Sequence, residues 1–265
     1  MAAPTVTGMA TLPNPLPRLA SLGLALPPGR LIDTTDEGPW HEPLLWLADD
    51  LAAPGTWDAL RHAPRALGLL PVTIEADGSQ GAPEGWDLMP GEMSYPGDHD
   101  AEEVLADLWE ASAAEGEEWP GLAEEPEAAE DDDPDTVAAE IADSLLAGGP
   151  LKDPRLALVP ARRSADIPTA IGWTGPMNHE GDTARISAVL RSWEDRYGIR
   201  VVALGFDHLL VSVAAPPTTL SDAQALAAEH FAFCPDIIWQ GSDTTLAEYA
   251  ERRLVGRPAW HFWWD

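Results

Sequence analysis

The sequence predicts an α+β protein whose C-terminal, mainly antiparallel sheet packs with helices. In the second half of the chain, β-rich runs and amphipathic helices follow the order β-α-α-β-β-α-α-β. In the first half, a strand–helix–strand pattern with short connections is typical of a small α/β module. Hydrophobic residues make up 45% of the 265 residues, which is enough for a folded core at this length.

The first half is predicted to hold a Pro-rich segment at 1–29 and a βαβ-like module at 30–110. The elements of this module are strands at 30–33 and 43–48, a helix at 56–67, a strand at 69–75 and a short helix at 101–109. Gly68 provides the stop signal of the first helix. A right-handed crossover through that helix would make the strands on either side of it parallel.

Acidic residues concentrate in a linker predicted at 111–150. Residues 1–150 hold 31 acidic and 4 basic residues, a net charge of −27, whereas residues 151–265 hold 14 and 11, a net charge of −3. The stretch 98–143 has 19 acidic residues and no Lys or Arg. Such a composition buries too little apolar surface to offset chain entropy, so we expect a disordered or loosely helical linker with one short helix at 137–146.

The C-terminal domain is predicted at 151–265, and its main helix has the clearest pattern. Asp182 is the expected N-cap of this helix, and Gly198 is its expected end. The apolar spacing i, i+3, i+4, i+7, i+11 predicts one buried stripe, made of Ile186, Val189, Leu190, Trp193 and Tyr197. The other predicted elements are strands at 156–160, 199–204, 209–214 and 259–264, and helices at 164–171, from Thr219 or Ser221 to 233, and at 244–254.

The formal net charge of −30 excludes several classes of partner. Nucleic-acid binding needs clustered Lys and Arg, and an anionic membrane surface is disfavoured for the same reason. The chain has no apolar run of the roughly 20 residues that a membrane span needs, and one cysteine, Cys234, fits a reducing compartment. We expect a soluble cytoplasmic protein with a cationic protein partner. A local basic face could still form from Arg162, Arg163, Arg185, Arg191, Arg196 and Arg200.

Several uncommon sequence words occur in order between residues 155 and 265. They are IGWTGP (171–176), LRSWEDRYG (190–198), AEHFAFCPD (228–236), IWQG (238–241), LAEYA (246–250) and WHFWWD (260–265). With these words the chain resembles the bacterial domain-of-unknown-function family 4253. A weaker resemblance near 43–109 is to the upstream part that often accompanies this domain. The resemblance implies no activity, substrate or cofactor.

His230 and Cys234 are the most chemically suggestive pair. Four residues apart in a predicted helix, they share one helical face. A zinc site would need further ligands such as His261 or Asp236, and a Cys–His nucleophile is an alternative. Cys234 lies at the C-terminal end of its helix, where the dipole opposes a thiolate. A structural role is therefore favoured, and no metal or cofactor is predicted.

The aromatic C-terminal strand is a second candidate. Alternation would place Trp260, Phe262 and Trp264 on one side and His261 and Trp263 on the other. Both sides could be covered by protein, as is common for tryptophan. An exposed Trp and His side would instead bind a partner or ligand.

The loop 173–182 is a third candidate because it leads into the main helix. Helix N-termini attract anions, and Arg185 could assist. The loop matches neither a Walker nor a dinucleotide motif, so a capped surface loop is favoured. His179, Glu180 and Asp182 would hold a metal only with ligands from another element.

Two functional hypotheses follow. The favoured one is a non-enzymatic interaction or immunity-like binding module, because HExxH, paired CxxC, GxSxG and GxxxxGK[ST] motifs are absent from the sequence. Small acidic proteins that neutralise basic toxins or nucleases suit this description. The alternative is a metal-dependent or Cys/His-dependent enzyme, or a small-ligand-binding protein, that uses the region of His230 and Cys234. The candidate binding surface comprises Trp173, Asn178, His179, Asp182, His230, Cys234, Asp236, Trp239, Trp260, His261 and Trp263.

Overall fold

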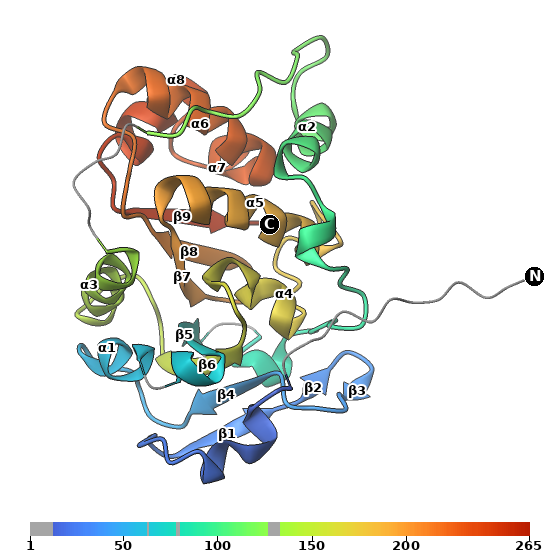
Figure 1. The fold of residues 1–265 in the computed structure, drawn as a ribbon. Helices are drawn as coiled ribbons and strands as arrows, with labels where there is room; N and C mark the ends of the chain where they lie inside the picture. The colour runs from blue at the N-terminus through green and yellow to red at the C-terminus, as the bar shows by residue number, and fades with distance from the viewer. Residues whose placement is uncertain (1–12, 63, 78–79, 127–132) are drawn as a thin grey trace, which may run out of the picture.

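A seven-stranded sheet runs through the protein (Figure 1). The structure is a computed structural model that describes residues 13–62, 64–77, 80–126 and 133–265. In sheet order the strands are β1 (Gly29–Ile32), β4 (Leu45–Ala48), β6 (Pro154–Pro160), β5 (Leu69–Glu75), β7 (Arg200–Leu204), β8 (His208–Ser212) and β9 (Ala259–Trp263). The pair β5–β7 is parallel and the other pairs of this sheet are antiparallel, which confirms the α+β class. A separate hairpin pairs β2 (Thr34–Thr35) with β3 (Gly38–Pro39).

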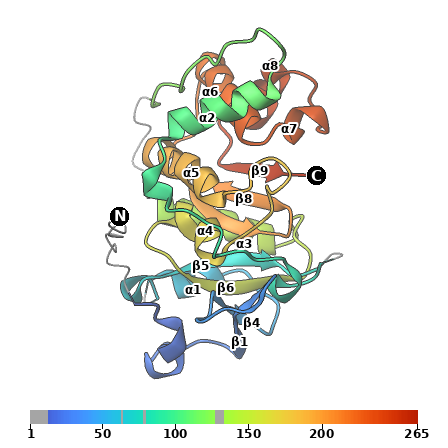
Figure 2. The same ribbon diagram turned by 90° about the vertical axis from the view of Figure 1, so that its right-hand side faces the viewer.

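Helices lie on both faces of the sheet (Figures 1 and 2). The larger hydrophobic cluster includes residues of α2 (Ala101–Ser112), α4 (Ile167–Ile171), α5 (Thr183–Tyr197), α6 (Leu220–Phe233), α8 (Leu246–Tyr249) and the π-helical turn η6 (Ala250–Leu254), and α7 (Asp236–Trp239) packs against it. The second cluster includes η1 (Leu16–Ser21), α1 (Thr56–Arg61) and α3 (Pro134–Leu146). Short 3-10 turns are η2 (Arg65–Leu67), η3 (Pro83–Gly85), η4 (Pro96–Asp98) and η5 (Ser164–Asp166). No helix in the described part of the chain is long and apolar enough to cross a membrane.

The main helix, α5, has the predicted ends and the predicted buried face. The Asp182 side chain accepts the N–H of Ala184 at 3.0 Å and so caps its first turn. Gly198 ends it with φ +60°, a conformation that favours glycine. All five residues of the predicted stripe are buried. The short helix α7, with Pro235 at its N-cap, is not among the elements that the sequence predicts.

Strand β6 joins the two predicted halves of the chain. It pairs antiparallel with both β4 and β5, so these two strands are parallel, as predicted, but are separated by β6. The 30–110 module and the 151–265 domain therefore contribute to one sheet. β6 occupies a central position because its residues Leu156, Ala157, Leu158 and Val159 are all buried, which requires cover on both faces.

Alternate strand residues belong to the two hydrophobic clusters. Ala157 and Val159 lie in the larger one, and Leu156 and Leu158 lie in the second. In β7, a register shift between Val201 and Ala203 interrupts this alternation, as a β-bulge does.

Arginines hold the acidic stretch 98–143 against the molecule where the structure describes it. Arg185 contacts Asp107 at 2.9 Å, and Arg196 donates to the carbonyl of Ala123 at 3.0 Å. In the segment 113–126, Ala123 is buried whereas residues 114–118 are exposed, so part of the linker expected from composition is held against the C-terminal half. The predicted helix at 137–146 is part of α3. Residues 127–132, in the densest acidic part, lie outside the described residues.

The positive charge of the expected basic face is largely neutralised by carboxylates of the same chain. Five of its six arginines contact carboxylates, namely Arg163, Arg185, Arg191, Arg196 and Arg200. Their charge is therefore used to join helices and strands of this chain.

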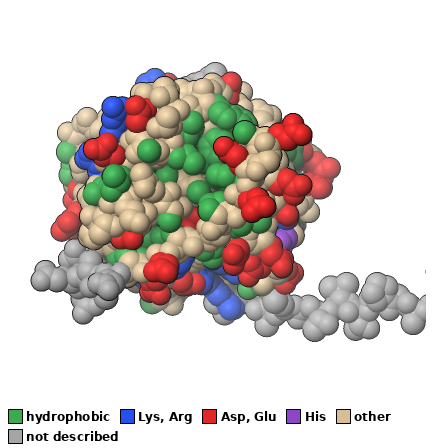
Figure 3. All heavy atoms as spheres, turned by 90° about the horizontal axis from the view of Figure 1, so that it is seen from above, with side chains coloured by type: hydrophobic (Ala, Val, Ile, Leu, Met, Phe, Trp, Pro, Cys, Tyr) green, Lys and Arg blue, Asp and Glu red, His purple; other side chains and the backbone are tan. Residues whose placement is uncertain are grey.

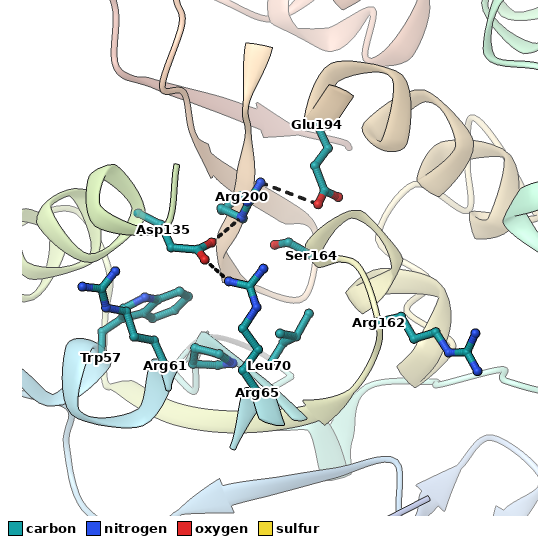
Figure 4. Close-up of a pocket in the computed structure, with 11 residues that line it drawn as sticks. Trp57, Arg61, Arg65, Leu70, Asp135, Arg162, Ser164, Glu194 and Arg200 are labelled. Atoms are coloured by element: carbon teal, nitrogen blue, oxygen red, sulfur yellow. Dashed lines mark hydrogen bonds and ion pairs between the residues drawn. The ribbon is translucent and has the colours of Figure 1, made fainter. Parts of the chain in front are cut away.

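Asp135 and Ala138 of α3 line a small pocket of about 40 Å³, together with several arginines (Figure 4). The carboxylate of Asp135 accepts hydrogen bonds from Arg65 and, at 2.7 Å, from Nε of Arg200. Burial lowers the pKa of Arg200, and the nearby Glu194 carboxylate, 3.6 Å away, acts in the opposite direction. The guanidinium of Arg200 thus joins α3, β7 and α5.

A fragment of residues 151–265 is expected not to fold by itself. Strand β5 lies between β6 and β7, and the fragment lacks it. Circular dichroism during urea denaturation should show no cooperative transition for the fragment, and mixing with a fragment of residues 1–126 should restore one. Cooperative unfolding of 151–265 alone would contradict this expectation.

Candidate functional site

The predicted site residues gather around β9 and the end of α6. As the alternation predicts, Trp260, Phe262 and Trp264 face the core, while His261 and Trp263 are exposed. Trp239, in α7, is also exposed, with 60% of its surface accessible. These residues mark two surfaces, one along β9 and one on the outer helices.

Four residues of the predicted binding surface are buried instead, namely Trp173, His230, Cys234 and Trp260. Trp173 shows why: its indole N–H donates to the carbonyl of Gly205 at 2.9 Å, and its ring packs edge-on against Trp264. A buried indole with a satisfied N–H contributes to the core and is inaccessible to a partner.

The polar residues of the loop 173–182 bind other parts of the chain. The Asn178 side chain donates to the carbonyl of Asp265 at 2.6 Å. The ring of His179 lies 2.8 Å from the carbonyl of Ala232. Asp182 caps α5, so its carboxylate already occupies the helix N-terminus where an anion was considered.

Arg185, which could have assisted such an anion, is also engaged. It contacts Glu180 at 2.8 Å as well as Asp107. The side chains of this loop therefore hold the start of α5 and the residue Asp265 in place.

His230 lies in an aromatic cluster. Its Nδ1 atom is 3.0 Å from the hydroxyl of Tyr249, and its ring packs on Trp193, Trp260 and Phe262. Burial lowers the pKa of His230 well below its usual range, and the nearby Arg196 acts in the same direction. The imidazole is therefore neutral at pH 7.

Cys234 is the C-cap residue of α6, which ends at Phe233, and its N–H donates to the carbonyl of His230. Its thiol donates to the carbonyl of Trp263 at 3.0 Å. Burial raises the pKa of this thiol far above neutral, so it is protonated and a poor nucleophile. Among the described residues, no group of three His, Cys, Asp or Glu could hold a metal ion.

Glu229 is the buried polar residue whose role sequence reasoning missed. Its carboxylate is fully buried and accepts from Nε1 of Trp193 at 2.8 Å, from Arg196, and from the N–H of Ala123 at 2.8 Å. Burial acts to lower the pKa of Arg196, and Glu229 outweighs it, so that this pKa is raised. The signal in the sequence is a Glu next to His230 in the apolar second half of α6.

A groove of about 480 Å³ runs along β9. It is lined by three of the predicted residues that remain accessible, Asp236, His261 and Trp263, together with residues that were not predicted, chiefly Tyr249, Arg252, Arg253 and Arg257. Its volume lies within the range of ligand-binding clefts. Asp236 accepts from the Gln240 side chain at 3.0 Å and from the N–H of Asp265 at 3.1 Å.

Asp243 orients two of the groove arginines. Its carboxylate contacts Arg252 at 2.9 Å and Arg253 at 2.8 Å. The Asp243 side chain is 4% exposed, whereas the arginine side chains are 58% and 53% exposed. Hydrogen bonds from Arg253 and then Arg252 lower the pKa of Asp243, so this carboxylate stays charged. Both arginines therefore present positive charge to the groove, whose wall also carries the carboxylate of Asp236.

The second surface is an aromatic row on the outer helices. Trp119 packs on Trp109, Trp109 on Phe231, and Phe231 on Trp239, with ring centroids 5.7, 5.7 and 5.9 Å apart. The first two rings are supplied by the acidic stretch and the other two by α6 and α7. The row ends at the exposed Trp239, and we call this surface the outer helical face.

Replacing Glu229 with Gln is expected to lower the free energy of unfolding by about 3 kcal/mol. The substitution removes the negative charge that faces Arg196. It also places an amide NH₂ group, which is a donor, among the N–H donors of Trp193, Arg196 and Ala123. Urea denaturation of E229Q measures this change, and the exposed Glu140→Gln in α3 is the matched control. Equal stability of the two variants would show that the buried pair contributes nothing net.

Cys234 is expected to resist thiol reagents in the folded protein. Its buried, protonated sulfur should react with Ellman's reagent at pH 8 only after unfolding in urea. Rapid modification of the native protein would contradict this expectation and would support the hypothesis of a Cys–His nucleophile.

Comparison with known proteins gives one match. No curated protein and no solved structure matches the chain. The model of the family described as "Domain of unknown function (DUF4253)" matches residues 155–265, a range that contains β7, β8, β9 and the helices between them. The resemblance drawn from the sequence words is thereby confirmed: residues 155–265 carry the features of the DUF4253 family.

Proposed function

We propose that this protein is a non-enzymatic, immunity-like interaction module whose outer helical face binds a basic protein. The observation that carries this proposal is the exposed Trp239 at the end of an aromatic row. Figure 3 shows hydrophobic side chains in the middle of the upper face, with Asp and Glu side chains around them. Tryptophans in such surroundings are frequent hot spots of protein interfaces.

Charge supports a basic partner. Exposed carboxylates of Glu110, Glu117 and Glu118 flank the row in sequence, and the stretch 98–143 has no Lys or Arg. Complementary charge speeds association and disfavours acidic competitors. A basic protein with an apolar contact patch fits both properties of this face.

The alternative, a metal-dependent or Cys/His-dependent enzyme, has less support. The thiol of Cys234 and the imidazole of His230 are buried and bind different partners, Trp263 and Tyr249. A cytoplasmic location remains part of the proposal, because the single cysteine is free and would be stable in a reducing compartment.

The test is affinity capture from a lysate of the source organism with the immobilised protein, followed by mass spectrometry. A true partner should be basic, and Trp239→Ala should weaken its binding by about 30-fold, the equivalent of about 2 kcal/mol for a tryptophan hot spot. The double substitution E117Q/E118Q should also weaken it, mainly by slowing association.

Matched controls lie elsewhere on the surface. Leu51→Ala removes an exposed apolar side chain beyond β4, and D36N/E37Q removes two exposed carboxylates of the β2–β3 hairpin. Neither control should change capture. The proposal fails if no captured protein depends on both Trp239 and the two glutamates.

A further inference from the structure

Strand β9 is an edge of the sheet, and its outer backbone groups can be identified. Val213 N–H donates to the carbonyl of Pro258, and Trp264 N–H donates to the carbonyl of Asp207. Residues 258 and 264 therefore bond toward β8. Because bonded and non-bonded pairs alternate in an antiparallel ladder, residues 259, 261 and 263 point their N–H and C=O groups away from β8.

These outward groups line the groove described above. Ala259, His261 and Trp263 are all part of its wall. The carbonyl of Trp263 accepts from the thiol of Cys234, as expected of an outward-facing group. For the other outward N–H and C=O groups of these three residues, the structure gives no hydrogen-bond partner within the described part of the chain. An edge of this kind is a template for an additional strand.

We infer that the groove binds an extended acidic peptide segment of a partner protein, which adds to the sheet alongside β9. Backbone hydrogen bonds to residues 259 and 261 and to the N–H of Trp263 would supply affinity, and the arginines of the groove would select the side chains. This site is separate from the outer helical face and does not depend on the function proposed for that face.

The charge of the groove selects an acidic occupant. Arg252 and Arg253 are more than half exposed beside the buried Asp243, and the carboxylates of Glu248 and Glu251 also act on Arg252. Arg257 donates through Nε to the carbonyl of Arg252, an arrangement that leaves its other guanidinium nitrogens available. Carboxylates on alternate residues of an added strand would meet these guanidinium groups, because alternate side chains share one face.

The shape of the groove favours a peptide over a compact ligand. Its wall includes Ala259, Trp260, His261 and Trp263 of β9, and the exposed indole of Trp263 lies at one end of that strand. Alternation of the acidic residues would also fix the register, because a slip by one residue turns the carboxylates away from the arginines.

The test uses a fluorescein-labelled eight-residue peptide of alternating Val and Glu, with fluorescence anisotropy as the readout. Salt at 150 mM gives a Debye length of about 8 Å, which screens the distant charge of the acidic protein. Saturable binding is expected, and R257Q should raise the dissociation constant about two- to fivefold. The matched control is R30Q on β1, the opposite edge of the sheet, which should leave the dissociation constant unchanged.

Two modified peptides separate strand addition from simple charge attraction. In an added strand, every second backbone N–H of the peptide points toward β9. Methylation of these nitrogens should weaken binding at least tenfold, whereas methylation of the nitrogens that point away from β9 should leave binding unchanged. A Val/Lys peptide should bind at least tenfold more weakly than the Val/Glu peptide. The inference is overturned if both methylated peptides bind like the parent, if the Val/Lys peptide binds as tightly, or if the Val/Glu peptide shows no binding up to 1 mM.

Discussion

The buried carboxylate of Glu229 is the interaction on which the packing of the C-terminal half depends. It projects from α6 and receives N–H groups from two residues of α5, Trp193 and Arg196, and from Ala123 in the acidic stretch. One side chain thus fixes the relative positions of three segments. The aromatic cluster between α5, α6 and β9 is built around the same contact, since Trp193 also packs on Trp260 and Phe262. Removing either charge would leave the other buried and unpaired, which is costly.

The sequence predicts the features that depend on residues close together in the chain, and it does not predict those that depend on contacts between distant residues. The ends and buried face of α5 and the alternation along β9 follow from spacing within a few residues, and each is confirmed. The position of β6 and the partners of Glu229 depend on residues far apart in sequence; Ala123 and Glu229 are separated by 106 positions. The partners of His230 and Cys234 are also distant in sequence: the imidazole of His230 contacts Tyr249, and the thiol of Cys234 donates to the carbonyl of Trp263.

Some acidic residues of the chain form ion pairs within the fold, and composition alone does not reveal this role. Carboxylates such as Glu229, Asp135 and Asp243 hold arginines of the C-terminal half, so that much of its positive charge is compensated. Asp243 differs from the others because it is buried while the side chains of the two arginines that it contacts are more than half exposed. The molecule therefore carries two surfaces of opposite character, an acidic aromatic face on the outer helices and a basic groove beside β9.

The position of β6 has a consequence for the order in which the chain is made. Synthesis from the N-terminus produces β4 and β5 first, and the strand that separates them is made only about 80 residues later. Until then both strands expose edges that can pair with other chains, which is the hazard of contacts between distant residues. The acidic stretch leaves the ribosome in exactly that interval, between β5 and β6. Like charge of this kind disfavours association between neighbouring chains.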